Sequence, residues 1–230
     1  MTTAPAYCRR VAYQQFGQWL PETGSIAGLF RAAWQIARHE MPDADLAAGE
    51  SVVENLAATV RSRARSRQPT AVLAHLHDVL FDLFGLQGNA DDYYAPANSY
   101  LPAVLETRRG IPITLTLLYL RVAAELGIRG WGVNAPGHFL AEVIDAGGDS
   151  MIVDAFDGGR LLTIKEAMAR ITEITGRSSI DQAHALARAT PRQWLDRMLN
   201  NLQASFAAAG QQRDVYAMQE LQQLLRQGPG

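Results

Sequence analysis

The stretch from Arg108 to Gly127, RRGIPITLTLLYLRVAAELG, constrains the fold most, because it is apolar on nearly every side. Pro112 suits the first turn of a helix, where its missing N–H is not needed, and Gly127 suits the left-handed position that ends one. A helix without a polar face is normally buried in the middle of a domain. Arg121 and Glu125 interrupt the stretch, which is also too short to span a membrane. The sequence therefore predicts a domain built around this helix.

The composition is that of an ordinary soluble globular protein. Of 230 residues, 48% are hydrophobic and 19% charged, and the formal net charge is −2. This charge gives no electrostatic reason to expect binding to nucleic acid or to an anionic membrane. Cys8 is the single cysteine, which excludes an internal disulfide and a thiolate metal site. The first 20 residues lack the apolar core of a signal peptide, so we expect a cytoplasmic protein.

Helical periodicity runs through the first part of the chain, and residues 1–95 are predicted as a helical region packed on a core. Ser25 can cap a helix that runs to about His39. Pro69 starts another helix, for which Gly85 is the stop signal.

The periodicity changes to two after the apolar helix, which predicts a small antiparallel sheet. Its expected strands are Arg129–Asn134, His138–Ile144 and Met151–Asp154. Thr163 can cap a further helix that ends near Thr175. Because the helices and strands do not alternate, the pattern favours an α+β fold over a doubly wound sheet.

Two amphipathic segments end the chain. Pro191–Ala209 and Arg213–Gln227 have apolar residues at helical spacing and are joined at Gly210. Their pattern predicts an antiparallel helical hairpin within a C-terminal region of residues 176–230.

His138 and Asp154 are the residues best suited to chemistry. They lie at the start of one predicted strand and the end of the next, which can be adjacent in an antiparallel sheet. A histidine oriented by an aspartate is the base half of a nucleophilic triad. Such sites place the nucleophile at the N-terminus of a helix, and the helix that begins near Pro112 is the candidate.

Here the chain resembles a known family. A Gly-x-Cys at the start of a buried helix, a following strand that begins Gly-Ile, and then His and Asp on successive strands form the transglutaminase-like pattern. This sequence has Gly110-Ile111-Pro112, Gly127-Ile128, His138 and Asp154. It looks more specifically like the SirB-type transglutaminase-like family of bacteria. The segments that carry this are NADDYYAPANSYLPAVLETRRGIPITLTLLYLRVAAELGI, GVNAPGHFL and IVDAFDGGRLL.

The resemblance implies a papain-like, transglutaminase-like core over residues 96–175 and tetratricopeptide-like helices over residues 176–230. It also implies that the nucleophile position falls on Pro112, which has no nucleophilic side chain. Cys8 belongs to a different predicted element. His138 and Asp154 are therefore interpreted as a relic pair that satisfies two polar groups.

Thr114 is the alternative nucleophile, since it is a hydroxyl residue in the first turns of the helix. His138 would then act as its base. However, a threonine inside a helix more often bonds to its own backbone.

Four residues are predicted ligand contacts. Arg108 and Arg109 can clamp a carboxylate or phosphate, although pairing with nearby acidic residues such as Asp91 is an equal alternative. Asn98 is the third, with capping of a short helix to about Thr107 as its alternative. Asp157 is the fourth, and it stands where the family usually has asparagine.

The leading hypothesis is a non-catalytic binding or regulatory module whose ligand site lies around Pro112, His138 and Asp154. The first alternative is an active hydrolase or acyltransferase that uses Thr114, His138 and Asp154. The second is an interaction scaffold that works through its terminal helices. No cofactor and no metal are expected. The partner is an unnamed protein or peptide, and the oligomeric state is left open.

Overall fold

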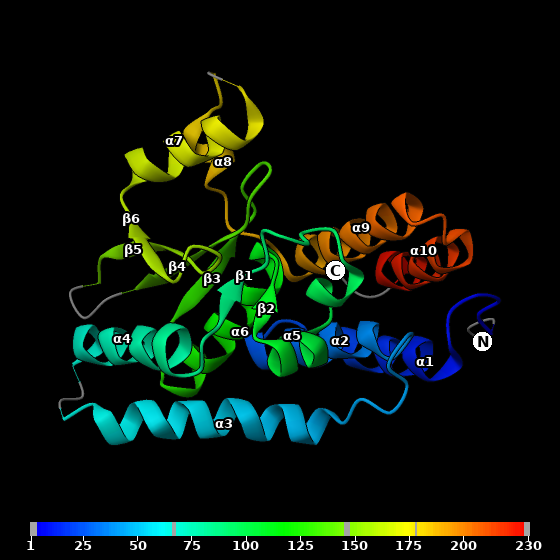
Figure 1. The fold of residues 1–230 in the computed structure, drawn as a ribbon, viewed down its shortest axis with the longest axis horizontal. Coiled ribbons are helices and arrows are strands. Elements are labelled where there is room, and N and C mark those ends of the chain that lie inside the picture. The colour runs from blue at the N-terminus through cyan, green and yellow to red at the C-terminus, as the bar shows by residue number, and fades with distance from the viewer. Residues whose placement is uncertain (1–3, 66–67, 145–147, 178, 228–230) are drawn as a thin grey trace.

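A computed structural model describes residues 4–65, 68–144, 148–177 and 179–227 (Figure 1). Its α-helices are α1 (Arg10–Trp19), α2 (Ile26–Ala37), α3 (Leu46–Arg63), α4 (Pro69–His77), α5 (Leu101–Thr107), α6 (Pro112–Glu125), α7 (Ile164–Thr175), α8 (Gln182–Ala185), α9 (Pro191–Ala208) and α10 (Gln212–Gln227). Its strands are β1 (Gln87–Gly88), β2 (Arg109–Gly110), β3 (Gly130–Val133), β4 (Leu140–Ile144), β5 (Ser150–Asp154) and β6 (Arg160–Leu162). In this part of the chain, no helix is long and apolar enough to cross a membrane.

Helix α6 is the central element, as the sequence predicts. It begins at Pro112, and every residue from Pro112 to Ala123 is buried. Gly127, just beyond its end, has a left-handed φ of 76°. Arg121 is tolerated inside the core because its Nη1 atom lies 2.5 Å from Glu125 Oε1, one turn further along the helix.

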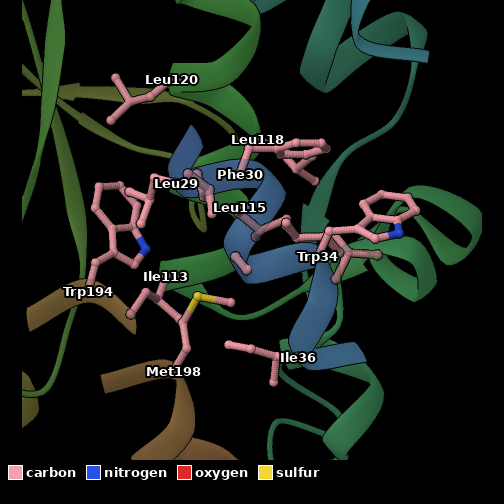
Figure 2. Close-up of a cluster of buried hydrophobic side chains, with 14 of the residues drawn as sticks. Leu29, Phe30, Trp34, Ile36, Ile113, Leu115, Leu118, Leu120, Trp194 and Met198 are labelled. Atoms are coloured by element: carbon pink, nitrogen blue, oxygen red, sulfur yellow. The ribbon is translucent and has the colours of Figure 1, made fainter. Parts of the chain in front are cut away.

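Helices from both ends of the sequence pack on α6 to form the core. Side chains of α2 and α9 gather around the first turns of α6 (Figure 2). Ile113 lies near Trp194 and Met198 of α9, whereas Leu115 lies near Leu29 and Phe30 of α2. Because α1 and α10 also join this cluster, the N-terminal and C-terminal helices share one core with α6.

The main sheet is antiparallel, with strand order β3-β4-β5-β6. The two faces of its strands differ, because successive side chains of a strand point to opposite sides. Ala141, Val143 and Val153 belong to the core built around α6. Leu140 and Ile152 pack with Ala167 of α7 instead. The sheet thus lies between α6 and α7, and α7 and α8 stand beyond it in Figure 1.

The local signals explain most element boundaries. Ser25 Oγ accepts a hydrogen bond from Gly28 N and caps α2, as predicted. Thr163 and Glu166 form a reciprocal capping box at the start of α7. The C-terminal hairpin of α9 and α10 turns at Gly210, whose φ is 72°.

Two predictions about boundaries need correction. The N-cap position of α5 is Tyr100, which makes no side-chain cap, so Asn98 does not cap this helix. His138 precedes β4 rather than beginning it, since the strand starts at Leu140. The short strands β1, β2 and β6 are absent from the sequence-based prediction.

Candidate functional site

His138 and Asp154 are brought together by the pairing of β4 with β5. The antiparallel register pairs Ala141 with Val153, so the end of β5 lies beside the turn that leads into β4. His138 is fixed in that turn by a hydrogen bond from its N–H to the Ala135 carbonyl. Its Nε2 atom lies 2.8 Å from Asp154 Oδ2.

The pair is almost completely buried. The side chain of His138 is 4% exposed and that of Asp154 is 1% exposed. Asp154 Oδ1 accepts hydrogen bonds from the backbone N–H groups of Phe156 and Asp157. Burial alone would raise the pKa of Asp154, but the hydrogen bond and charge of His138 and these two N–H groups outweigh it and lower that pKa. The carboxylate is therefore held as an anion.

His138 Nδ1 is the ring nitrogen that remains for other contacts, because Nε2 is used by Asp154. Among the described residues it has no hydrogen-bond partner. The ring lies edge-on to Phe156, with 6.3 Å between centroids, and Phe156 in turn packs against Tyr93. The immediate surroundings of the histidine are thus aromatic.

The first turn of α6 provides no free nucleophile. Pro112 is its first residue. Thr114 is fully buried, and its hydroxyl lies 2.7 Å from the Asn98 carbonyl and 3.0 Å from that of Ile111. The same oxygen accepts a hydrogen bond from Ile111 N. Within the described residues, no hydrogen bond joins Thr114 to His138.

Asp154 points to the α7 side of the sheet. It alternates with Val153, which faces α6, and it shares a face with Ile152, which packs with α7. Arg170 of α7 confirms this orientation, because its Nε atom lies 3.9 Å from Asp154 Oδ2. The carboxylate of Asp154 therefore lies on the face of the sheet opposite α6, the helix that would carry a nucleophile.

A pocket of about 220 Å³ opens beside Asp154, between β6 and α7. It is lined by Asp154, Asp157, Arg160, Leu162, Glu166, Ala169, Arg170 and Glu173. Arg160 lies within 4 Å of both Asp157 and Glu166. Arg170 Nε is buried and makes no hydrogen bond to any described residue. The pocket thus offers the Nε–H of Arg170 as a donor without a hydrogen bond, and its acidic lining residues are Asp154, Asp157, Glu166 and Glu173.

The four predicted ligand contacts are placed differently. Asp157 lines this pocket. Asn98 is buried, and its amide donates to the carbonyls of Asp92 and Tyr93, which fixes the loop before α5. Arg108 lies over the ring of Phe84, and Arg109 Nη1 lies 3.5 Å from Asp91 Oδ2. Neither arginine lines the pocket beside Asp154, and whether they contact a ligand stays a prediction.

Cys8 is not placed for catalysis. It lies just before α1, and its backbone N–H donates to the carboxylate of Glu220 in α10. Burial, followed by the negative charge of Glu220, raises the pKa of its thiol to about 12. The thiol is therefore protonated at neutral pH. In the described ranges of the chain, no three His, Cys, Asp or Glu side chains are grouped so as to hold a metal ion.

Sequence reasoning missed Arg160 and Arg170, the cations that face Asp154. Two signals point to them. Gly158 and Gly159 allow a tight turn after β5. This turn brings Arg160 of β6 opposite Asp154 of β5. The capping box fixes the start of α7, and Glu166 and Arg170 then share one helix face.

Comparison with known proteins gives a consistent family. The model of the transglutaminase-like superfamily matches residues 48–200. A UPF0162 protein of Xylella fastidiosa (strain 9a5c) is 37% identical over 185 residues, which cover 78% of this chain and 65% of the relative. A UPF0162 protein of Pseudomonas aeruginosa is 31% identical over 209 residues, covering 87% of this chain and 72% of the relative.

A different kind of protein matches part of the chain. Human F-box only protein 21 is 40% identical over 102 residues, which cover 41% of this chain and 16% of that protein. The chain thus spans about two thirds of the length of the Xylella relatives and a small part of the F-box protein. No solved structure matched the chain significantly.

Proposed function

The chain belongs to the transglutaminase-like superfamily, and on that premise we propose that it is a non-catalytic member that works as a binding or regulatory module. The observation that carries this proposal is the start of α6. Pro112 occupies the predicted nucleophile position, and the Thr114 hydroxyl is already bonded to the Asn98 carbonyl. A base without a nucleophile within reach cannot begin covalent catalysis.

The ligand site of this module is the pocket beside Asp154, and its occupant is a segment of a protein or peptide. Arg170 Nε is buried and makes no hydrogen bond to a described residue, so it can donate to a backbone carbonyl or carboxylate of the partner. Asp157 lies at the same pocket and can accept from an N–H group. The matched stretch in the F-box protein supports a module that also works as part of larger chains.

A peptide-binding experiment tests this proposal. A phage-displayed peptide library is selected on the purified protein, and the affinities of the selected peptides are measured for Arg170→Gln and for Arg177→Gln. Arg177 is an exposed arginine that follows α7 and lies outside the pocket, which makes it the matched control. We expect Arg170→Gln to weaken binding about tenfold or more, since a hydrogen bond to a charged group is worth about 1.5–3 kcal/mol. Equal binding by both variants would refute the assigned site.

Three finer features belong to the same proposal. We place the chain in the SirB-type group, with the α9–α10 hairpin as a tetratricopeptide-like element. Residues 1–95, 96–175 and 176–230 are the proposed units, and the cytoplasm is the proposed compartment. The tetratricopeptide-like assignment is supported by the packing of the α9–α10 hairpin on the core through Trp194 and by its turn at Gly210.

A further inference from the structure

A cluster of three polar side chains lies where the turn before β4, the loop before α5 and helix α9 meet. The Phe156 ring packs against Tyr93 at 5.9 Å and against His138 at 6.3 Å between centroids. Arg197 of α9 joins them, because its Nη1 atom and the backbone N–H of His138 donate to the same Ala135 carbonyl. We call Tyr93, His138 and Arg197 the Arg197 cluster, and none of them lines the pocket described above.

Arg197 is a partly buried cation whose partners are all neutral. Its Nη1 atom donates to Asn134 Oδ1 at 2.6 Å and to the Ala135 carbonyl at 2.7 Å, and its guanidinium lies over the ring of Phe139. Burial lowers the pKa of Arg197, and no carboxylate of the described ranges acts against this. A cation withdrawn from water without an opposite charge costs free energy. A carboxylate from outside the chain would supply the missing charge.

The guanidinium of Arg197 presents the edge that best fits a carboxylate. Nη1 uses its two N–H groups within the protein. Nε and Nη2 make no hydrogen bond in the part of the chain that the structure describes, and neither atom is shut off from solvent. These two nitrogens form a planar fork that matches the two oxygens of a carboxylate. One guanidinium also balances the single charge of a carboxylate, whereas a phosphate group carries about −1.5 to −2.

The other two members of the cluster also have unused hydrogen-bonding atoms. The hydroxyl of Tyr93 makes no hydrogen bond to a described residue. Burial raises the pKa of Tyr93 and the positive charge of Arg197 opposes this rise, so the two side chains lie close together and the hydroxyl keeps its proton. His138 Nε2 is directed at the carboxylate of Asp154, so Nδ1 of the neutral ring is an acceptor.

All three members are held in place by bonds that need no ligand. The buried amide of Asn98 donates to the Tyr93 carbonyl at 3.2 Å. His138 is held by Asp154, and Arg197 by the turn before β4. A site whose groups are already ordered loses less conformational entropy when a ligand binds.

We propose that the Arg197 cluster binds a carboxylate of a peptide. Nε and Nη2 of Arg197 each donate to one carboxylate oxygen, and the hydroxyl of Tyr93 donates to one of them as well. His138 Nδ1 accepts a hydrogen bond from a backbone N–H of the same peptide. This site is separate from the pocket beside Asp154 and does not depend on it.

The experiment screens the full chain by fluorescence polarisation against N-acetylated tetrapeptides in three matched libraries. The first library has free C-terminal carboxylates and no acidic side chains, the second has the same sequences as C-terminal amides, and the third has amides with one glutamate. We expect members of the first or the third library to bind, and their counterparts in the second to bind about tenfold more weakly or not at all. Binding by the first library assigns the C-terminus of a partner, and binding by the third assigns an acidic side chain.

Paired variants assign the binding to the cluster. Arg197→Gln should weaken it about tenfold or more, whereas Arg213→Gln, at an exposed position of α10, should leave it unchanged. Tyr93→Phe should weaken it about fivefold and keep the melting temperature, because it removes only a hydroxyl without a hydrogen bond. Tyr216→Phe, also in α10, is its control. The NMR signal of the Arg197 Nε–H group, identified by its loss in Arg197→Gln, should shift when a bound peptide is added.

The two proposed sites can fail separately. Arg170→Gln should leave the binding of the carboxylate peptides at the wild-type level, because Arg170 lines only the pocket beside Asp154. Carboxylate binding that is lost in Arg170→Gln and kept in Arg197→Gln would overturn the proposal. Equal binding by acid and amide libraries, no binding by any carboxylate peptide, or wild-type affinity in both Arg197→Gln and Tyr93→Phe would also overturn it.

Discussion

Asp154 is the residue on which the geometry of the candidate site depends. Its carboxylate accepts hydrogen bonds from His138, Phe156 and Asp157 while it is 1% exposed. A buried charge of this kind is stable only while its partners remain. The site is therefore an integral part of the packing between the sheet and α7, whatever binds beside it.

Asp154→Asn is expected to lower the free energy of unfolding at neutral pH by on the order of 3–5 kcal/mol, the usual cost of breaking a buried charged pair. The pKa of Asp154 is lowered in the folded state, so its stabilisation is present above the ordinary aspartate pKa. That stabilisation is lost as the pH falls through the lower, folded-state value. Urea unfolding of both proteins between about pH 7 and pH 3 measures this, and the difference between them should shrink in acid. A difference that stays constant would contradict this assignment.

Thr114 and Thr116 form a matched pair for testing the role of the helix start. Both are fully buried in α6. Thr114 bonds the Asn98 carbonyl at 2.7 Å, whereas Thr116 makes one longer contact of 3.4 Å to the Phe139 carbonyl. Thr114→Val should lower the free energy of unfolding by about 1–3 kcal/mol, because it leaves Ile111 N without its side-chain acceptor. Thr116→Val should cost less, and chemical denaturation compares the two. A larger loss for Thr116→Val would mean that Thr114 is not the structural anchor.

At the scale of elements, the sheet and the C-terminal hairpin meet through a glycine. Gly132 of β3 lies against Trp194 of α9, and a Cβ atom there would come within 2.1 Å of the indole ring. Trp194 also packs on Phe139, with 4.5 Å between ring centroids. The close approach of the hairpin to the sheet therefore requires glycine at this position.

Gly132→Ala is expected to destabilise the protein by about 1–3 kcal/mol, the usual cost of overpacking a core. Gly24→Ala is the control, since an added Cβ there would meet no atom within 4 Å. Thermal unfolding followed by tryptophan fluorescence checks the pair, because the indole of Trp194 reports on this contact. Equal stability of both variants would show that α9 can move away from the sheet at little cost.

The helix signals in the sequence located most elements, whereas the short strands and the cations of the site depend on tertiary contacts. Pro112 and Gly127 bound α6, and Thr163 starts α7, because these residues act locally. Strand β6 has three residues and forms only by pairing with β5. Arg170 occupies one face of α7, and the sequence does not say which strand that face covers. Asn98 has the right type for a cap, but its buried amide bonds the preceding loop instead.

At the scale of the whole molecule, one hydrophobic core joins α1, α6, α9 and α10. The first and last helices are part of this core, because Phe16 of α1 and Leu221 of α10 are both fully buried in it. The proposed units are therefore expected to unfold together rather than separately.

Phe16→Ala and Leu221→Ala should each shift a single unfolding transition, with losses of about 2–5 kcal/mol. Circular dichroism and tryptophan fluorescence should report the same midpoint for each variant. An early transition confined to the helices, with the fluorescence transition unchanged, would show that a terminal region unfolds on its own.

The proposed function requires that the buried His138–Asp154 pair has no working nucleophile beside it. The most direct test is the rate at which the purified protein hydrolyses a p-nitrophenyl ester and a peptide amide, measured for wild type, His138→Ala and Thr114→Val. We predict that the wild-type rate equals the rate without protein and that neither substitution changes it. A wild-type rate above that background, abolished by His138→Ala, would contradict the claim.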